Sequence, residues 1–437
     1  MGLDSSRSRS GGCFQEARSA LVEATAQLSR ALAHIASLQG TQALRREQIK
    51  LQVALAIALM HTKGYAAPET RQALEKASSF IDQAGELGEA LEDPLLMFSV
   101  LFGFYNANIV AFDGNAVRKI AAQISALAEK DSTRQPLMIA HRVTAVSLLL
   151  TGNCLEARAH FDHAIALYDL AEDRSGPTRF GQDSRASSLC FRSWDMWLLG
   201  YPEAALADAS RALADAREIG LVTTIMFALH HVALTHVYCA EFAAARALAD
   251  ELLGLAREKG SRYWEISAKI TQGCIMALNG GAADAIDTIS SGIQAARATG
   301  STLGSPFKLS CLARGFIRLG RLDDARRAID EAVSAIEVGQ ERWGEAEVHR
   351  TAAEIALCAS DAAAAEDRLK QALNVARMQR ARSLELRAGM SMARLWRDQG
   401  KRTEARDLLA PIYGWFTEGF DTPDLKEAKV LLDELAS

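Results

Sequence analysis

The chain has 437 residues, of which 49% are hydrophobic and only 6% aromatic, and its formal net charge is −5 at pH 7. Because this charge creates no broad positive field, we expect neither nucleic acid nor a membrane surface as a partner. The seven cysteines form no Cys-x-x-Cys pair, and an odd number spread along the chain is not a disulfide framework. With no charged and apolar leader segment in view, we expect a protein of the reducing cytoplasm.

Residues 1–13 consist mainly of Ser, Arg and Gly, which predicts a disordered start. Gly2 and Ser6 match the loose myristoylation pattern, but so short a pattern often arises by chance. Amphipathic helices are predicted next, over residues 14–38, 44–61 and 68–87.

Two later runs carry no charge, over residues 95–112 and 221–240. The first run is near the lower length limit of a membrane span. Two asparagines interrupt it, and Asp93 and Asp113 flank it in place of basic anchors. Three histidines and three threonines interrupt the second run. Both runs therefore predict helices that are buried within the protein and do not span a membrane.

A short pattern returns every forty residues in the second half of the chain. Its small-residue turn markers are Gly200, Ala240, Gly280, Gly320, Ser360 and Gly400. Alanine lies five residues after each marker, and a small residue lies seven before it. Because helices cross closely only where side chains are small, these columns predict the crossing points of a repeated helical hairpin. Glycines at 220, 260, 300 and 339 predict the C-terminal caps of the second helices.

This spacing is that of a tetratricopeptide repeat, lengthened from the usual period of about 34 residues. One such hairpin cannot bury its apolar face alone, so the units must stack into an α-solenoid. Turns at Gly114 and Gly152 continue the array toward the N-terminus with less regular spacing. The predicted fold is all-α, with nine helix pairs and one helix at each end. We expect the repeats over residues 14–422 and a capping helix over 423–437.

No catalytic or metal-binding motif is complete. Gly176 and Gly181 have the glycine spacing of a phosphate-binding loop, but Gln182 and Asp183 replace the required Lys and Ser/Thr. Residues 173–183 therefore predict a surface loop. Two residue pairs share helix faces without further ligands at metal spacing, namely His160 with His163 and Cys190 with Trp194. We expect no enzyme activity, no cofactor and no metal.

The repeat register predicts a binding groove. In tetratricopeptide arrays the first helix of each pair lines the concave surface, here at thirteen, ten, six and three residues before each marker. The early groove positions are mainly apolar and include Trp194, Trp197, Phe227 and His230. The later ones are charged, and they include Arg314, Glu347, Arg350, Glu354, Arg387, Arg394 and Arg397. Two alternatives stay open: a groove for a partly anionic ligand, or a solvated face with weak local ion pairs.

From about Glu16 onward the chain resembles the C-terminal repeat region of large bacterial regulators that join a class III adenylate/guanylate cyclase domain to a signal-transduction ATPase domain. The likeness is carried by residues 63–69, 197–205, 341–343, Glu347 and Arg350, and most narrowly by 413–422 with 424–428. Neither the cyclase metal carboxylates nor a Walker lysine is present in this chain.

The resemblance therefore implies a non-catalytic regulatory scaffold in signalling, which binds a protein segment or a small effector. One alternative is a truncated or split part of such a regulator, with the catalytic modules on another chain. A second alternative is a scaffold that associates with itself.

Overall fold

A computed structural model describes residues 23–436, except for 39, 88, 90–94, 132, 171 and 174–180. Within that part of the chain the regular elements are all helices, and no strand is present. The predicted disordered start over 1–13, with Gly2 and Ser6, lies outside the described residues. So does most of the loop predicted over 173–183, Gly176 included.

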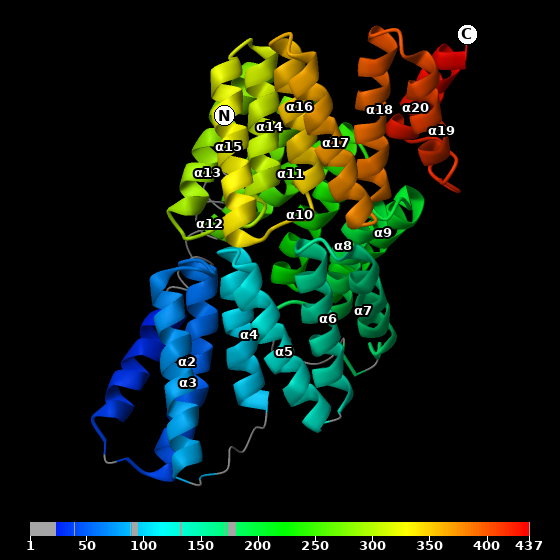
Figure 1. Cartoon of the computed structure of the whole chain (residues 1–437). Helices are drawn as coiled ribbons and strands as arrows, with labels where there is room; N and C mark the ends of the chain where they lie inside the picture. The colour runs from blue at the N-terminus through cyan, green and yellow to red at the C-terminus, as the bar shows by residue number, and fades with distance from the viewer. Residues whose placement is uncertain are drawn as a thin grey trace, which may run out of the picture.

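The helices form consecutive antiparallel pairs (Figure 1). Residues 23–36 are helical and precede the first pair. The early pairs are α2 (Gln42–Thr62) with α3 (Pro68–Glu86), α4 (Leu95–Val110) with α5 (Gly114–Asp131), and α6 (Arg134–Leu150) with α7 (Cys154–Ala166). The middle pairs are α8 (Ser184–Leu198) with α9 (Pro202–Ile219), α10 (Val222–Tyr238) with α11 (Phe242–Glu258), and α12 (Arg262–Leu278) with α13 (Ala282–Arg297). The late pairs are α14 (Ser305–Arg318) with α15 (Leu322–Gly339), α16 (Glu345–Cys358) with α17 (Ala362–Met378), and α18 (Arg382–Asp398) with α19 (Arg402–Tyr413), and α20 (Pro423–Ala436) ends the array.

The forty-residue pattern produces these hairpins as predicted. All six turn markers have left-handed backbone, with φ of 95° at Gly200, 59° at Ala240, 107° at Gly280, 71° at Gly320, 61° at Ser360 and 82° at Gly400. The alanines five residues after the markers are completely buried, at Ala205, Ala245, Ala285, Ala325, Ala365 and Ala405. A methyl group is the largest side chain that fits at these crossings, so the small-residue columns set the helix packing.

The predicted caps need one correction. Glycines 220, 260 and 300 are left-handed as expected, but Gly339 is the last residue of α15, and Gln340 takes the left-handed position with φ of 64°. Gln340 donates its backbone N–H to the Ile336 carbonyl at 2.8 Å. The absence of a side chain at Gly339 has a different reason, because a Cβ there would lie 3.1 Å from the Phe112 carbonyl oxygen.

The stack coils into a superhelix whose successive turns touch. The backbone N–H groups of Thr302 and Leu303 donate to the Val110 carbonyl at 2.8 and 3.0 Å, which joins the α13–α14 connection to the α4–α5 turn. Helix α18 likewise contacts α8, five pairs earlier. One superhelical turn therefore takes about five pairs. In Figure 1, α2 to α7 lie in the lower half of the view and α12 to α18 in the upper half.

Two further contacts continue this inter-turn seam. The backbone N–H groups of Arg342 and Trp343 donate to the Leu150 carbonyl at 2.9 and 3.3 Å. The Ser383 hydroxyl donates to the Trp197 carbonyl at 2.5 Å. We use "seam" for these contacts and those of Thr302 and Leu303. Because the seam joins one turn to the next, the concave surfaces of the two turns face a common interior.

The last part of the chain closes the seam at its end. The loop between α19 and α20 lies against the start of α9, where Glu203 accepts a hydrogen bond from the Gly419 N–H at 2.7 Å. Glu418 in turn accepts one from the Ala204 N–H at 3.0 Å. The segment 413–422, which carries the narrowest part of the sequence resemblance, therefore forms a contact between superhelical turns.

The two uncharged runs form α4 and α10, which pack within the array as predicted. Along α10, twelve of seventeen residues are buried. None of the described helices is both long and apolar enough to cross a membrane.

Candidate functional site

Two neighbouring cavities lie in the interior beside the seam. The first, which we call the His230 cavity, has an empty volume of about 810 Å³ with its mouth included. The second, the Arg142 cavity, has one of about 640 Å³. They share His231, Tyr263 and Leu303 as walls. Mainly apolar walls with a few polar groups are typical of small-molecule sites.

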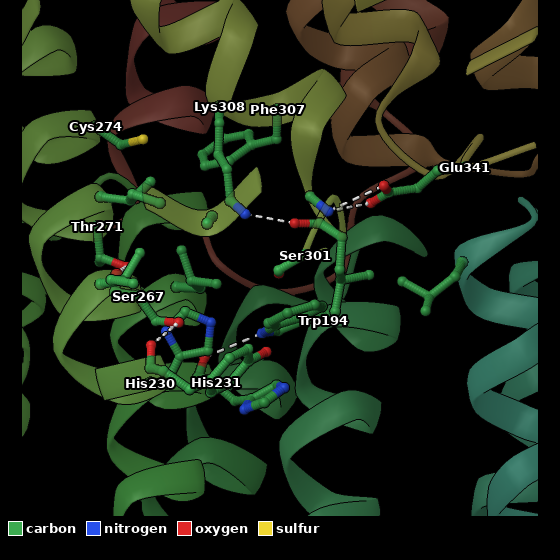
Figure 2. A pocket seen from close by; sticks show the side chains of 18 of the residues that line it. Trp194, His230, His231, Ser267, Thr271, Cys274, Ser301, Phe307, Lys308 and Glu341 are labelled. Carbon is green, nitrogen blue, oxygen red and sulfur yellow. Dashed lines mark hydrogen bonds between the residues drawn. The ribbon is translucent and has the colours of Figure 1, made fainter. Parts of the chain in front are cut away.

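The His230 cavity is defined by Trp194, His230, Leu234, Tyr238, Ser267, Thr271, Cys274, Phe307, Lys308, Glu341 and Trp343 together with the shared walls. Figure 2 shows the two histidines and Trp194 on one side of it, and Lys308 and Phe307 on the opposite side. Helices α8, α10, α12 and α14 supply most of these residues, while Glu341 and Trp343 come from the α15–α16 connection. Both superhelical turns thus contribute to one cavity.

A stack of rings forms its floor. The His231 ring lies between those of Phe227 and Trp194, with centroid distances of 3.9 and 4.9 Å. Trp194 Nε1 donates to the His231 carbonyl at 3.0 Å (Figure 2). His231 Nδ1 lies 2.8 Å from the Phe227 carbonyl, so Nδ1 carries the hydrogen and Nε2 is an acceptor. The floor therefore consists mainly of apolar ring faces.

His230 presents a polar atom without a protein partner. Its Nδ1 is buried and makes no hydrogen bond within the described chain. Burial lowers the pKa of His230 well below its usual value, and the neighbouring His231 adds to that effect. Burial also lowers the pKa of His231 to about 4. Both imidazoles are therefore neutral at pH 7, and Nδ1 of His230 is available to a ligand.

Lys308 and Glu341 form a polar part of the cavity wall. Both carboxylate oxygens of Glu341 accept the Gly304 N–H at 3.0 Å, and Oε1 also accepts Trp343 Nε1 at 2.9 Å. The Lys308 ammonium donates to the Leu303 carbonyl at 2.5 Å (Figure 2). Burial raises the pKa of Glu341 to about 7, although the Trp343 hydrogen bond and the Lys308 charge oppose the rise.

The Arg142 cavity holds one guanidinium among aromatic rings. Arg142 lies on α6 and is only 5% exposed. Its Cζ lies 5.0 Å from the centre of the Phe102 ring. It makes no hydrogen bond or ion pair with any described residue, and its Nη1 is completely buried. The amides of Asn106 and Gln182 line the same cavity.

A third cavity, of about 920 Å³, is charged. Arg314 pairs with Glu347 at 2.6 Å, and Arg350 pairs with Glu354 at 2.6 Å. Helix α20 supplies further carboxylates that the register did not include. These form the pairs Arg387 with Asp424 at 2.8 Å, Arg394 with Glu427 at 2.5 Å, and Arg397 with Glu434 at 2.7 Å. The later arginines are thus largely neutralised within the chain.

The predicted groove residues divide among these sites. Trp194 and His230 line the His230 cavity, Phe227 lines the Arg142 cavity, and the charged cavity is lined by Arg314, Glu347, Arg350, Arg387 and Arg394. Trp197, Glu354 and Arg397 line none of the three. Trp197 is 3% exposed and packs between the Tyr238 ring at 5.2 Å and the Arg387 guanidinium at 4.9 Å. The binding role of all these residues stays a prediction.

Sequence reasoning missed several residues of the interior. Arg142 lies ten residues before Gly152, so the groove register would have indicated it if applied to the less regular early pairs. Glu341 and Trp343 lie in a connection between pairs, where the register assigns no groove position. Only the superhelical closure brings them to the cavity.

The sequence predicts no metal site at the two residue pairs that share helix faces, His160 with His163 and Cys190 with Trp194. The Nδ1 atoms of His160 and of His141 on α6 are hydrogen-bonded at 3.0 Å. The centroid of the His163 ring lies 5.0 Å from that of the His141 ring. In the described part of the chain, no group of three or more His, Cys, Asp or Glu is arranged to hold a metal ion. Cys190 is buried in the core.

The array of helical hairpins defines a tetratricopeptide-like helical-repeat protein. The chain matches no family model. It is 23% identical over 389 residues to the uncharacterized protein R02095 of Rhizobium meliloti (strain 1021), a match that covers 88% of this chain and 37% of that protein. The chain therefore spans little more than a third of this curated relative.

Two solved structures are similar. A Rap protein complexed with Competence and Sporulation Factor has a TM-score of 0.58 at 12% identity, covering 89% of this chain and 99% of that one. The apo form of the quorum sensor NprR from B. thuringiensis has a TM-score of 0.49 at 12% identity, covering 84% and 98%. The likeness to the Rap protein establishes the shared fold.

Proposed function

We propose that this chain is a regulatory binding module that holds a small, mostly apolar ligand inside its superhelix. The observation that carries the proposal is the pair of partly open aromatic cavities beside the seam, where His230 Nδ1 and Arg142 Nη1 have no hydrogen-bond partner among the described residues. Apolar walls supply affinity, and a few polar groups fix the orientation of a bound molecule. Such an unpartnered group is costly when buried, and a ligand that bonds it removes that cost.

Ligand binding would favour the closed superhelix. The walls come from both sides of the seam: Trp194 and His231 from the earlier turn, and Leu303 and Trp343 from the later one. A molecule that touches both turns stabilises the state in which they meet, and it shifts the population toward that state. A Rap protein of the same fold is complexed with Competence and Sporulation Factor, which supports a binding role for this chain.

The relative of R. meliloti is much longer than this chain, and residues 413–422 resemble the corresponding segment of cyclase–ATPase regulators. We propose that the ligand state controls catalytic modules on the same or another chain, while this chain is itself non-catalytic. Purified protein should neither cyclise nor hydrolyse nucleoside triphosphates, because a phosphate cradle with its lysine is missing from the sequence. Turnover that follows the protein peak through purification would contradict this part.

A protein segment at the charged cavity is the second candidate. That cavity presents Arg394, whose side chain is 36% exposed. Replacing Arg394 by Glu should weaken a partner captured from native cell extract by at least about tenfold, or 1.4 kcal/mol. Unchanged affinity would leave the charged cavity without a binding role.

The leading proposal is tested with N-phenyl-1-naphthylamine, a neutral probe that fluoresces in apolar surroundings. The wild-type protein should bind it saturably. A double variant, Ser187→Phe with Ser267→Phe, places one ring in each cavity and should weaken binding at least about tenfold. The control places the same rings on exposed positions, by Ser29→Phe with Ser291→Phe, and should bind like the wild type.

Far-UV circular dichroism checks that each variant keeps its helices, and Leu at the two cavity positions provides a milder filling. Equal probe affinity in the folded cavity variant and in the control would contradict an interior ligand site.

A further inference from the structure

Among the described residues, none forms a hydrogen bond or an ion pair with the Arg142 guanidinium, and its Nη1 is buried. Burial lowers the pKa of its guanidinium to about 10, which still leaves it charged at pH 7. Tyr105 and, to a smaller extent, Asp183 oppose this lowering of the pKa, but the Asp183 carboxylate already accepts the Ala186 N–H at 2.7 Å and the Tyr168 hydroxyl at 2.6 Å. A buried charge without a hydrogen-bonded partner is strongly unfavourable.

This situation differs from that of the arginines in the charged cavity. Each of those has a carboxylate of the chain within 3 Å, as for Arg314 with Glu347 and Arg387 with Asp424. Arg142 instead lies against the Phe102 ring, with its Nη1 buried and unbonded. The ring compensates only part of the lost hydration. The remaining donors fit an anion from outside the chain.

We propose that the ligand of the interior is an apolar monoanion, whose carboxylate or sulfonate binds Arg142 and whose apolar body lies against Phe191 and Phe227. The inference rests on the proposed function and specifies the ligand class for the same site. A guanidinium presents two parallel N–H donors to such an oxyanion. Asn106 and Gln182, whose side chains carry amide donors, also line the cavity.

The charge of the ligand follows from the cavity lining. Among its described residues, Arg142 is the sole cationic side chain, since His231 is neutral at pH 7. One guanidinium compensates one negative charge. A phosphate monoester with nearly two charges would carry an uncompensated charge into an apolar cavity, and is disfavoured.

Two probes with the same ring system separate the anionic group from the apolar body. 1-Anilinonaphthalene-8-sulfonate carries one sulfonate, and N-phenyl-1-naphthylamine is the same skeleton without it. The wild-type protein should bind the sulfonate at least about tenfold more tightly than the neutral probe. In Arg142→Met the sulfonate should lose at least about tenfold in affinity, while the neutral probe changes less than about threefold.

The matched control is Arg118→Met, which removes a charge from an exposed arginine of α5 that donates a hydrogen bond to Asn115. It should leave both affinities unchanged. Arg142→Met should also melt no lower than the wild type without probe, because it removes a buried unpaired charge. If that variant fails to fold, the ratio of the two affinities in the wild type decides the proposal.

The outcomes separate the two levels of the argument. Binding of both probes with no preference for the sulfonate would overturn the anion inference and leave the apolar site intact. The same holds if Arg142→Met weakens both probes equally. Binding of neither probe by the folded wild type would overturn the proposed function and this inference together.

Discussion

Closure of the superhelix can be tested at Gly200, in the turn between α8 and α9. Its φ of 95° is left-handed, and a Cβ there would lie 2.5 Å from Trp415 Cζ3 and 2.8 Å from Arg382 Cβ. Both neighbours belong to the next superhelical turn. Gly200→Ala therefore strains the backbone and also pushes the two turns apart.

The chain offers a matched control in Gly320. This residue occupies the equivalent marker position, with φ of 71°, but nothing lies within 4 Å of its hypothetical Cβ. An alanine in left-handed conformation costs about 1–2 kcal/mol at either position. Overpacking adds about 1–3 kcal/mol at Gly200 alone. Gly200→Ala should thus destabilise the protein by about 2–5 kcal/mol, against about 1–2 kcal/mol for Gly320→Ala.

Urea unfolding followed by far-UV circular dichroism measures both losses. Hydrogen exchange of the Gly419 amide, which bonds Glu203 across the turns, reports local opening. It should accelerate in Gly200→Ala and stay unchanged in Gly320→Ala. Equal destabilisation in the two variants, with equal exchange at Gly419, would refute contact between the superhelical turns.

Three further predictions concern single side chains. Because the pKa of Glu341 is raised from 4.5 to about 7, its contribution to stability is present below about pH 4.5 and lost as the pH rises through about 7, a loss of about 3 kcal/mol. Glu341→Gln should remove this decline when unfolding free energies at pH 5 and pH 8 are compared, and an unchanged decline would contradict the assignment. Arg387→Met should lower the free energy of unfolding by about 3 kcal/mol, since it leaves Asp424 unpaired. Arg394→Met removes a more exposed ion pair and should lower it by less than about 1 kcal/mol. Equal losses in the two variants would be evidence against a structural role for Arg387. Ala240→Gly should raise the free energy of unfolding by about 0.5–1 kcal/mol by relieving a left-handed alanine with φ of 59°, and a decrease would show that the turn is unstrained.

The sequence predicted the features that depend on local spacing. Small residues such as Ala205 and Ser193 mark helix crossings because contact within a hairpin depends on neighbours a few residues away. The groove register placed Trp194, Phe227 and His230 toward the interior for the same reason. Pair-to-pair rotation leaves no comparable pattern.

That rotation accumulates over five pairs and decides which distant residues meet. It brings Thr302 to Val110 and Trp343 to Leu150, contacts about 190 residues apart that no periodicity indicates. The carboxylates of α20 were missed because this helix lies outside the repeat. The charge balance of the late groove therefore could not be judged from the repeated positions alone.

Hydrogen exchange at the seam with and without N-phenyl-1-naphthylamine tests the central claim, that a ligand is held between two superhelical turns that close on each other. The account predicts at least about tenfold slower exchange on probe binding for the amides of Leu303 and Trp343, which bond the earlier turn. Amides at the ends of α16 and α17 that lie away from the seam should exchange at unchanged rates. Saturable probe binding with no protection at Leu303 and Trp343, or with the same protection everywhere, would contradict it.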